Sequence, residues 1–169
     1  MSKFVSAKIK MKSGARLAAV QANYMIALGQ LPVDEVIEDF VQGKIGRFAI
    51  DDKGDEQENL VELNPIDTEY FEKLVRGVQA RKEELEKSLN HYLHGEWSYE
   101  RMNGTMQALL LSAVYELSAT EDIDTKILIQ EYVDLAYAFF NKNEPKMVNA
   151  LLDQIAHAIR GKDGCFETL

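Results

Sequence analysis

Two histidines with helical spacing are the first side chains here whose arrangement suits metal chemistry. His91 and His94 lie in the segment HYLHGE, which also contains Glu96. Imidazoles at i and i+3 on a helix can share one zinc ion. We do not expect a metal site, because no second ligand pair occurs at a comparable spacing. Histidines near the negative end of a helix are ordinary partners of its dipole.

Patterns for catalysis and cofactor binding are otherwise missing from the sequence. Neither of the glycine-rich phosphate-binding patterns GxxxxGK and GxGxxG occurs. His157 has no serine or cysteine nucleophile near it in the chain, and the carboxylate pair Glu83 and Glu84 lies among charged neighbours, as on a solvated face. The single cysteine, Cys165, has no disulfide partner. We therefore predict a protein that is not an enzyme and that needs no cofactor.

The distribution of charge is the strongest indication of a binding function. The formal net charge is −9 at pH 7, yet the first 30 residues contain no acid and carry Lys3, Lys8, Lys10, Lys12 and Arg16. Their balance of +5 leaves −14 for the other 139 residues. A basic arm on an acidic body is typical of chains that bind nucleic acid. A disordered, solvated N-terminus is the alternative interpretation.

Trp97, the only tryptophan, allows two interpretations. An exposed indole could stack on an RNA base. An indole at the joint between two helices more often fills the gap there, with its N–H hydrogen-bonded. We expect the second arrangement.

Helices are expected to position these residues. Asp67 is a candidate N-cap, Pro145 fits a first helical turn, and Gly29, Gly43 and Gly161 fit helix ends. Apolar spacing predicts helices over residues 13–29, 33–41, 67–95, about 100–120, 126–140 and 145–160. No convincing strand is predicted, and the acidic segment 44–64 lacks periodicity, which favours a surface loop. Six or seven helices with short connections indicate an all-α bundle.

The expected organisation is a basic arm (1–12), one helical domain (13–161) and a C-terminal tail (162–169). A chain of this length can bury about 70% of its unfolded surface. The apolar runs are far shorter than the roughly 20 residues that span a bilayer, and the N-terminus lacks a signal-peptide core. We therefore expect a cytoplasmic protein that does not enter a membrane.

The segment ALLLSAVYELS (108–118) is the most apolar part of the chain. Leu109, Leu110 and Leu111 point about 100° apart on a helix, so three directions need a cover. We predict that neighbouring helices surround this one.

Three blocks taken together resemble the family of the transcription antitermination factor NusB. ARLAAVQANY (15–24) is similar to its first-helix signature AR.xAVQALY, and DTEYFEKLVRGV (67–78) to its third-helix block. ALLLSAVYELS, ILIQEYVDLAYAF (127–139) and MVNALLDQIAHAIR (147–160) follow its C-terminal half. Each block alone is an ordinary amphipathic helix, and their order and spacing carry the resemblance.

The resemblance implies a NusB-like all-helical fold of two small helical subdomains packed together, and a role without catalysis. NusB proteins bind the boxA element of nascent ribosomal RNA jointly with the ribosomal protein NusE, and help RNA polymerase to read through terminators. The implied partners are therefore boxA RNA, NusE and the RNA polymerase antitermination complex. The sequence leaves the oligomeric state open, and a homo-oligomer is compatible with it.

Candidate site residues follow from their positions in these blocks. Gln21 and Tyr24 also have plainer explanations, as a polar helix edge and as core packing. The residues implied to bind RNA are Lys8, Lys10, Lys12, Arg16, Gln21 and Asn149. The residues assigned to a protein partner are Tyr24, Met106, Leu111 and Met147.

One departure from the family weakens the expectation of RNA binding. Where the family reads DRxILR, this chain has Met106 to Leu111, so an acid and two arginines are missing. The arm also carries lysine in place of arginine, and lysine cannot clamp a phosphate with two parallel bonds. A second hypothesis is therefore a helical adaptor that binds protein without RNA, through an exposed apolar patch of Met106, Leu110 and Leu111. A third is the detached RNA-binding domain of an rRNA cytosine methyltransferase.

Overall fold

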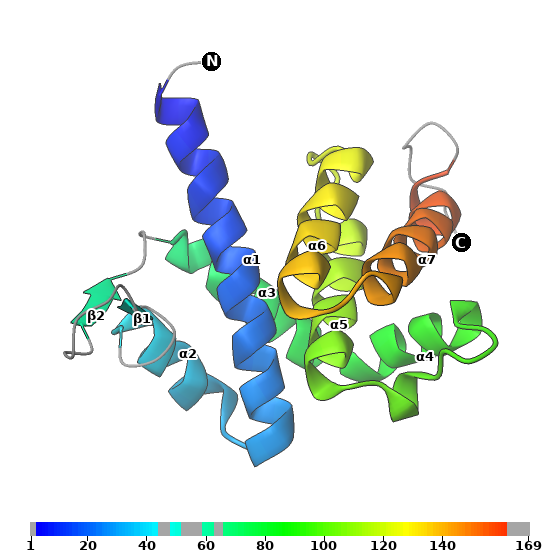
Figure 1. Cartoon of the computed structure of the whole chain (residues 1–169), viewed down its shortest axis with the longest axis horizontal. Helices are drawn as coiled ribbons and strands as arrows, with labels where there is room; N and C mark the ends of the chain where they lie inside the picture. The colour runs from blue at the N-terminus through cyan, green and yellow to red at the C-terminus, as the bar shows by residue number, and fades with distance from the viewer. Residues whose placement is uncertain (1–2, 44–47, 52–58, 63–65, 162–169) are drawn as a thin grey trace. The chain divides into compact units, whose positions relative to one another are not determined.

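A computed structural model of the chain describes residues 3–43, 48–51, 59–62 and 66–161 (Figure 1). Within these residues the chain forms seven α-helices, which confirms the all-helical class. It divides into two compact units, Met1–Arg76 and Gly77–Leu169. The helices are α1 (Lys3–Gly29), α2 (Val33–Val41), α3 (Thr68–Ala80), α4 (Lys82–Tyr92), α5 (Gly104–Ala119), α6 (Thr125–Phe139) and α7 (Asn143–Arg160), with a short 3-10 helix η1 (Tyr99–Arg101) before α5.

The basic arm is part of helix α1. This helix begins at Lys3, well before the start predicted at residue 13, and continues to Gly29, the predicted end. Residues 3–13 contain no glycine or proline, so nothing in this stretch opposes a helix. The lysines of the arm therefore have fixed angular positions around a helix axis.

Helix α2 forms as predicted. It spans Val33–Val41 and buries Val36, Ile37 and Phe40. Phe40 packs on Phe71 of α3, with 5.4 Å between ring centroids. In the same unit, Arg76 of α3 pairs with Asp34 at 2.8 Å. Aromatic packing and an ion pair thus join α2 and α3.

A β-hairpin replaces part of the predicted loop. Strands β1 (Phe48–Asp51) and β2 (Asn59–Glu62) pair antiparallel in a register from Phe48↔Glu62 to Asp51↔Asn59. The expectation of an irregular segment without strands is wrong for these residues. Neither FAID nor NLVE alternates strictly between apolar and polar residues, so the pattern that marks a half-buried strand is missing from both. The rest of 44–64 lies outside the described residues.

The long helix predicted over 67–95 is two helices. The N-cap at Asp67 is confirmed, because its Oδ1 accepts the backbone N–H of Tyr70 at 3.0 Å. The chain then breaks at Arg81, whose backbone is not helical (φ −113°, ψ 17°). Apart from Ala80, the residues between Val78 and Leu85 are polar, so the apolar stripe is interrupted there as well.

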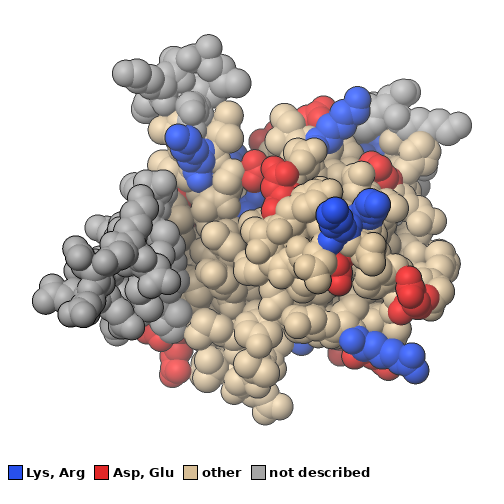
Figure 2. All heavy atoms as spheres, in the orientation of Figure 1, with Lys and Arg blue, Asp and Glu red and all other residues tan. Residues whose placement is uncertain are grey.

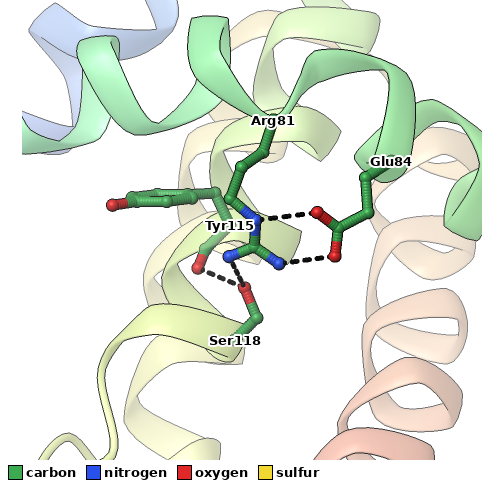
Figure 3. Close-up of polar contacts among 4 residues, drawn as sticks. All are labelled: Arg81, Glu84, Tyr115 and Ser118. Carbon is green, nitrogen blue, oxygen red and sulfur yellow. Dashed lines mark hydrogen bonds and ion pairs between the residues drawn. The ribbon is translucent and has the colours of Figure 1, made fainter.

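The side chain of Arg81 holds this break against α5 (Figure 3). Its guanidinium donates to both oxygens of Glu84, at 3.0 and 2.9 Å. It also donates to Ser118 Oγ at 3.2 Å and lies 5.8 Å from the ring centroid of Tyr115. These contacts hold Arg81, and with it the start of α4, on α5.

Helix α5 is the most buried helix of the second unit. It contacts α4, α6 and α7. Leu109, Leu110 and Leu111 are 0%, 0% and 4% exposed, as predicted for a helix surrounded by others. No helix in the described part of the chain is apolar over the length that a bilayer requires.

A buried arginine ties the end of α7 to the turn after α5. Arg160 is 2% exposed, and burial lowers the pKa of its guanidinium from the ordinary value. The group donates to the carbonyl oxygens of Leu117 at 3.0 Å and Ile123 at 2.6 Å, and also to that of Thr120. Gly161 ends the helix with φ 75°, as predicted.

Candidate functional site

The predicted RNA-binding residues of α1 lie on two different faces of the helix. With 3.6 residues per turn, Lys8, Lys12 and Arg16 follow one another at i, i+4 and form one row. Lys10 lies on the nearly opposite side. Gln21 and Tyr24 follow Lys10 after about three and four turns, so they share its face.

Lys8 and Lys10 are exposed, and Lys12 is half-buried. Basic side chains are visible on the surface of the N-terminal part of α1 in Figure 2. Lysines on both sides of one helix make its N-terminal half cationic over much of its circumference. Such a helix attracts an anionic polymer without dictating its sequence.

The row of Lys8, Lys12 and Arg16 meets an aromatic ring on α3. The Nζ of Lys12 lies 5.0 Å from the ring centroid of Tyr70, and the guanidinium carbon of Arg16 lies 5.7 Å from it. A third cation, Lys73, has its Nζ at 5.9 Å from the same centroid. Sequence reasoning did not find Tyr70 or Lys73, because both lie within an ordinary amphipathic helix.

Arg16 requires a correction. Its side chain was expected to contact RNA, but the residue is only 3% exposed. A buried guanidinium cannot reach an RNA strand that binds at the surface of the protein. Arg16 therefore places a positive charge beside Tyr70, and we no longer expect it to contact a phosphate directly.

Gln21 and Tyr24 lie at the edge of the buried face of α1. Both are half-buried, whereas Val20 and Asn23 are 0% and 2% exposed. Their side chains therefore keep part of their surface in solvent. Contact with an RNA or protein partner is compatible with these positions and stays a prediction.

On α7 the two candidate residues flank a core position. Val148 is fully buried, Met147 is half-buried and Asn149 is exposed. Asn149 thus has the accessible amide that contact with a base edge needs. Met147 is partly exposed, which suits contact with a protein.

Met106 and Leu111 require a second correction. They are 2% and 4% exposed, and Leu110 is 0% exposed. The apolar patch that the adaptor hypothesis needs is therefore not at the surface. Met106 and Leu111 put buried apolar side chains where the family pattern has its acid and its second arginine, an exchange that is often neutral or stabilising. At the place of the first arginine, Gln107 is half-buried and donates to the carbonyl oxygen of Tyr99 at 2.7 Å.

Trp97 lines a small hollow at the start of α5 and α7. The residue is half-buried, so it is neither a core residue nor an exposed platform. The hollow has a volume of about 320 Å³, and its lining includes Met102, Met106, Phe140 and Glu144.

Elsewhere in the same unit, His91 packs edge-on against Tyr92. Among the described residues, no three His, Cys, Asp or Glu gather as a metal site would require.

Comparisons with known proteins agree on one family. The model of the NusB family matches residues 13–157. The transcription antitermination protein NusB of Rhodospirillum rubrum is 40% identical over 155 residues, which cover 88% of this chain and 84% of the relative. The protein of the same name from Novosphingobium aromaticivorans is 38% identical and covers 89% of this chain and 96% of its own length.

Solved structures show the same fold. The NusB of T. maritima superposes with a TM-score of 0.65 at 23% identity, over 85% of this chain and 89% of that one. A chain from a crystal structure of the antitermination factors NusB and NusE with double-stranded RNA gives a TM-score of 0.67 at 23% identity, over 86% and 96%. At these identities the structures support the fold alone.

Proposed function

This chain belongs to the NusB family, and we propose that it is a transcription antitermination factor that binds boxA RNA of nascent ribosomal transcripts together with NusE. It acts in the cytoplasm, without catalysis, as part of an RNA polymerase antitermination complex. The observation that carries the proposal is the N-terminal helix of this family member. In an otherwise acidic chain, it carries five basic residues and no acid up to residue 30.

Phosphate contacts and base contacts have separate roles in this proposal. Lys8, Lys10 and Lys12 neutralise phosphates and hold the strand in place. Gln21 and Asn149 supply amides that can hydrogen-bond the edges of unstacked bases. Single-stranded RNA exposes both kinds of group, which suits a surface of lysines and amides.

The proposed contacts with NusE are Tyr24 and Met147, whose side chains are half-buried. A related NusB occurs with NusE and RNA in one solved structure. Aromatic and methionine side chains are enriched in protein interfaces, because they bury a large area and keep few polar atoms.

The test is filter binding of boxA RNA, with and without NusE, over a range of salt concentrations. We expect NusE to strengthen binding, and log K to fall linearly with log salt by about 0.7 for each phosphate contacted. The triple variant K8Q/K10Q/K12Q is expected to reduce the slope by about 2. The matched control K82Q/K87Q/K126Q removes the same charge from α4 and α6 and is expected to keep the slope. No RNA binding in the presence of NusE would reject the proposal.

The two alternative functions are less well supported. The adaptor hypothesis needs an exposed patch at residues that are buried. The methyltransferase-domain hypothesis needs relatives with a large additional domain, whereas the curated relatives are matched over 84% and 96% of their own lengths. Capture of NusE without any RNA binding is the result that would favour the adaptor.

A further inference from the structure

We propose that Lys73 and Tyr70 of α3 complete, with Lys12 of α1, a binding site for a backbone phosphate of the RNA. This inference rests on the proposed function. It adds helix α3 to the proposed RNA contacts, which so far come from α1 and from Asn149 of α7. It also predicts that the row of Lys8 and Lys12 continues onto α3.

Three cations converge on one ring at this point. The Nζ atoms of Lys12 and Lys73 lie 5.0 and 5.9 Å from the centroid of Tyr70, with the buried guanidinium of Arg16 at 5.7 Å. The two ammonium groups can be no farther apart than the sum of their distances. That sum is close to the Debye length of about 10 Å at 0.1 M salt, so their fields overlap.

The backbone holds the two helices in this arrangement. The N–H of Asp67 donates to the carbonyl oxygen of Met11 at 3.1 Å, directly before Lys12. The same residue caps α3 by accepting the N–H of Tyr70 at 3.0 Å. A Cβ at Gly14 would lie 2.8 Å from Ile66 Cγ2, so glycine is what lets the residue before this cap approach α1 so closely. These contacts therefore keep Lys12 and Tyr70 next to each other without any contribution from the charge of Lys12.

The nearby carboxylates do not neutralise the two lysines. Glu72 and Asp34 both pair with Arg76, at 2.8 Å each. Glu69 precedes Lys73 by one helical turn, a spacing at which a helical ion pair could form. Its exposed side chain does not pair with Lys73. Neither Lys12 nor Lys73 forms an ion pair within the described residues. Two ammonium groups that lack carboxylate partners make a position at which an anion is stabilised.

The chemistry of the site fits a phosphate diester. Lysine binds phosphate as a point charge with three donors. The ring of Tyr70 restricts where the two ammonium groups can lie, because each interacts with its π-electrons. Lys73 is exposed and Lys12 is half-buried, so a strand at the surface can reach both.

The experiment compares single charge removals in the full chain, with boxA RNA and NusE present. Lys73→Gln is expected to weaken binding about three- to tenfold at low salt and to reduce the salt slope by about 0.7. Lys73→Arg keeps the charge and is expected to restore the slope. The matched control Lys87→Gln removes an exposed lysine from α4 and is expected to leave the slope unchanged.

The outcomes separate this inference from the proposed function. If the unaltered chain binds RNA and Lys73→Gln behaves like Lys87→Gln, the inference is wrong and the proposed function stands. If the unaltered chain binds no RNA with NusE present, the proposed function is wrong and this inference fails with it. Competition by inorganic phosphate at constant ionic strength distinguishes the source of the anion. Loss of phosphate binding in Lys73→Gln with an unchanged RNA slope would show a small-anion site and would overturn the inference.

Discussion

The ring of Tyr115 occupies the space that a side chain at Gly77 would need. A Cβ built on Gly77 would lie 1.9 Å from Tyr115 Cζ and 2.3 Å from its hydroxyl oxygen. Tyr115 is 8% exposed, and the guanidinium of Arg81 lies over its ring. The C-terminal part of α3 therefore approaches α5 as closely as it does only because residue 77 has no side chain.

Gly77→Ala is expected to destabilise the protein. At an ordinary helical position this change would stabilise the helix by about 1 kcal/mol, because alanine has the higher helix propensity. Here the methyl group must displace a buried aromatic ring, and overpacking of this kind costs about 1–3 kcal/mol or more. Urea unfolding monitored by circular dichroism measures the change in unfolding free energy.

A double-mutant cycle with Tyr115→Leu tests the cause. If the ring is what opposes the methyl group, Gly77→Ala should be much less costly in the Tyr115→Leu background. An equal loss in both backgrounds would mean that the glycine is required for another reason.

The ion pair of Arg81 and Glu84 gives stability a weak acid dependence. The Arg81 side chain lowers the pKa of Glu84, chiefly through a side-chain hydrogen bond. The contribution of Glu84 is therefore complete above its unfolded-state pKa and is lost as the pH falls through that value towards the folded one. The carboxylate is 66% exposed, so Glu84→Gln is expected to cost less than about 1 kcal/mol at pH 7.

Glu83→Gln is the matched control for this pair. Glu83 is the exposed neighbour of Glu84 in the first turn of α4. Urea unfolding at pH 7 and pH 3 should show a cost of Glu84→Gln that shrinks at the lower pH. The cost of Glu83→Gln should not follow this pattern, and the same pH dependence in both variants would assign the effect to the helix dipole.

Local signals in the sequence predict the helices well where one residue decides the outcome. The ends of α2, the cap at Asp67 and the stop at Gly161 are set by neighbours within a few positions. The break at Arg81 is different, because its contact with Ser118 joins residues 37 positions apart. Periodicity alone cannot register a contact over that distance.

The candidate site was predictable in the same limited way. The exposure of Lys8, Lys10 and Asn149 follows from their places outside the apolar stripes. The burial of Arg16 and Met106 does not, since it depends on what packs over them. The convergence of Lys12 and Lys73 on Tyr70 needs the packing of α3 on α1, which no single helix pattern contains.

Arg160→Met is expected to reduce the unfolding free energy by about 2–4 kcal/mol. The guanidinium donates to the carbonyl oxygens of Leu117, Thr120 and Ile123, and these acceptors would lose their donor in a buried place. Arg160→Lys should recover only part of the loss, because an ammonium cannot reproduce the planar fork. Chemical denaturation of the three proteins gives the comparison. Full recovery by lysine would show that the charge alone matters at this position.

Leu111→Arg restores the residue that the family pattern has at this position, and it is expected to destabilise this chain by about 3 kcal/mol or more. Leu111 is 4% exposed, and Met106 stands where the family pattern has its acid. An arginine introduced there would be a buried charge without its counter-ion, which is among the most costly single changes. Leu111→Met conserves volume and apolar character, so it should cost less than about 1.5 kcal/mol.

The result at position 111 also bears on function. If Leu111→Arg unfolds at a lower urea concentration than Leu111→Met by the expected margin, position 111 is a buried site. It then holds an apolar residue in this chain where the family pattern has an arginine. If the arginine variant is as stable as the methionine variant and increases the salt slope of RNA binding by about 0.7, residue 111 reaches solvent and faces the RNA. That result would contradict the burial of Leu111 and would move the binding surface from α1 and α3 towards α5.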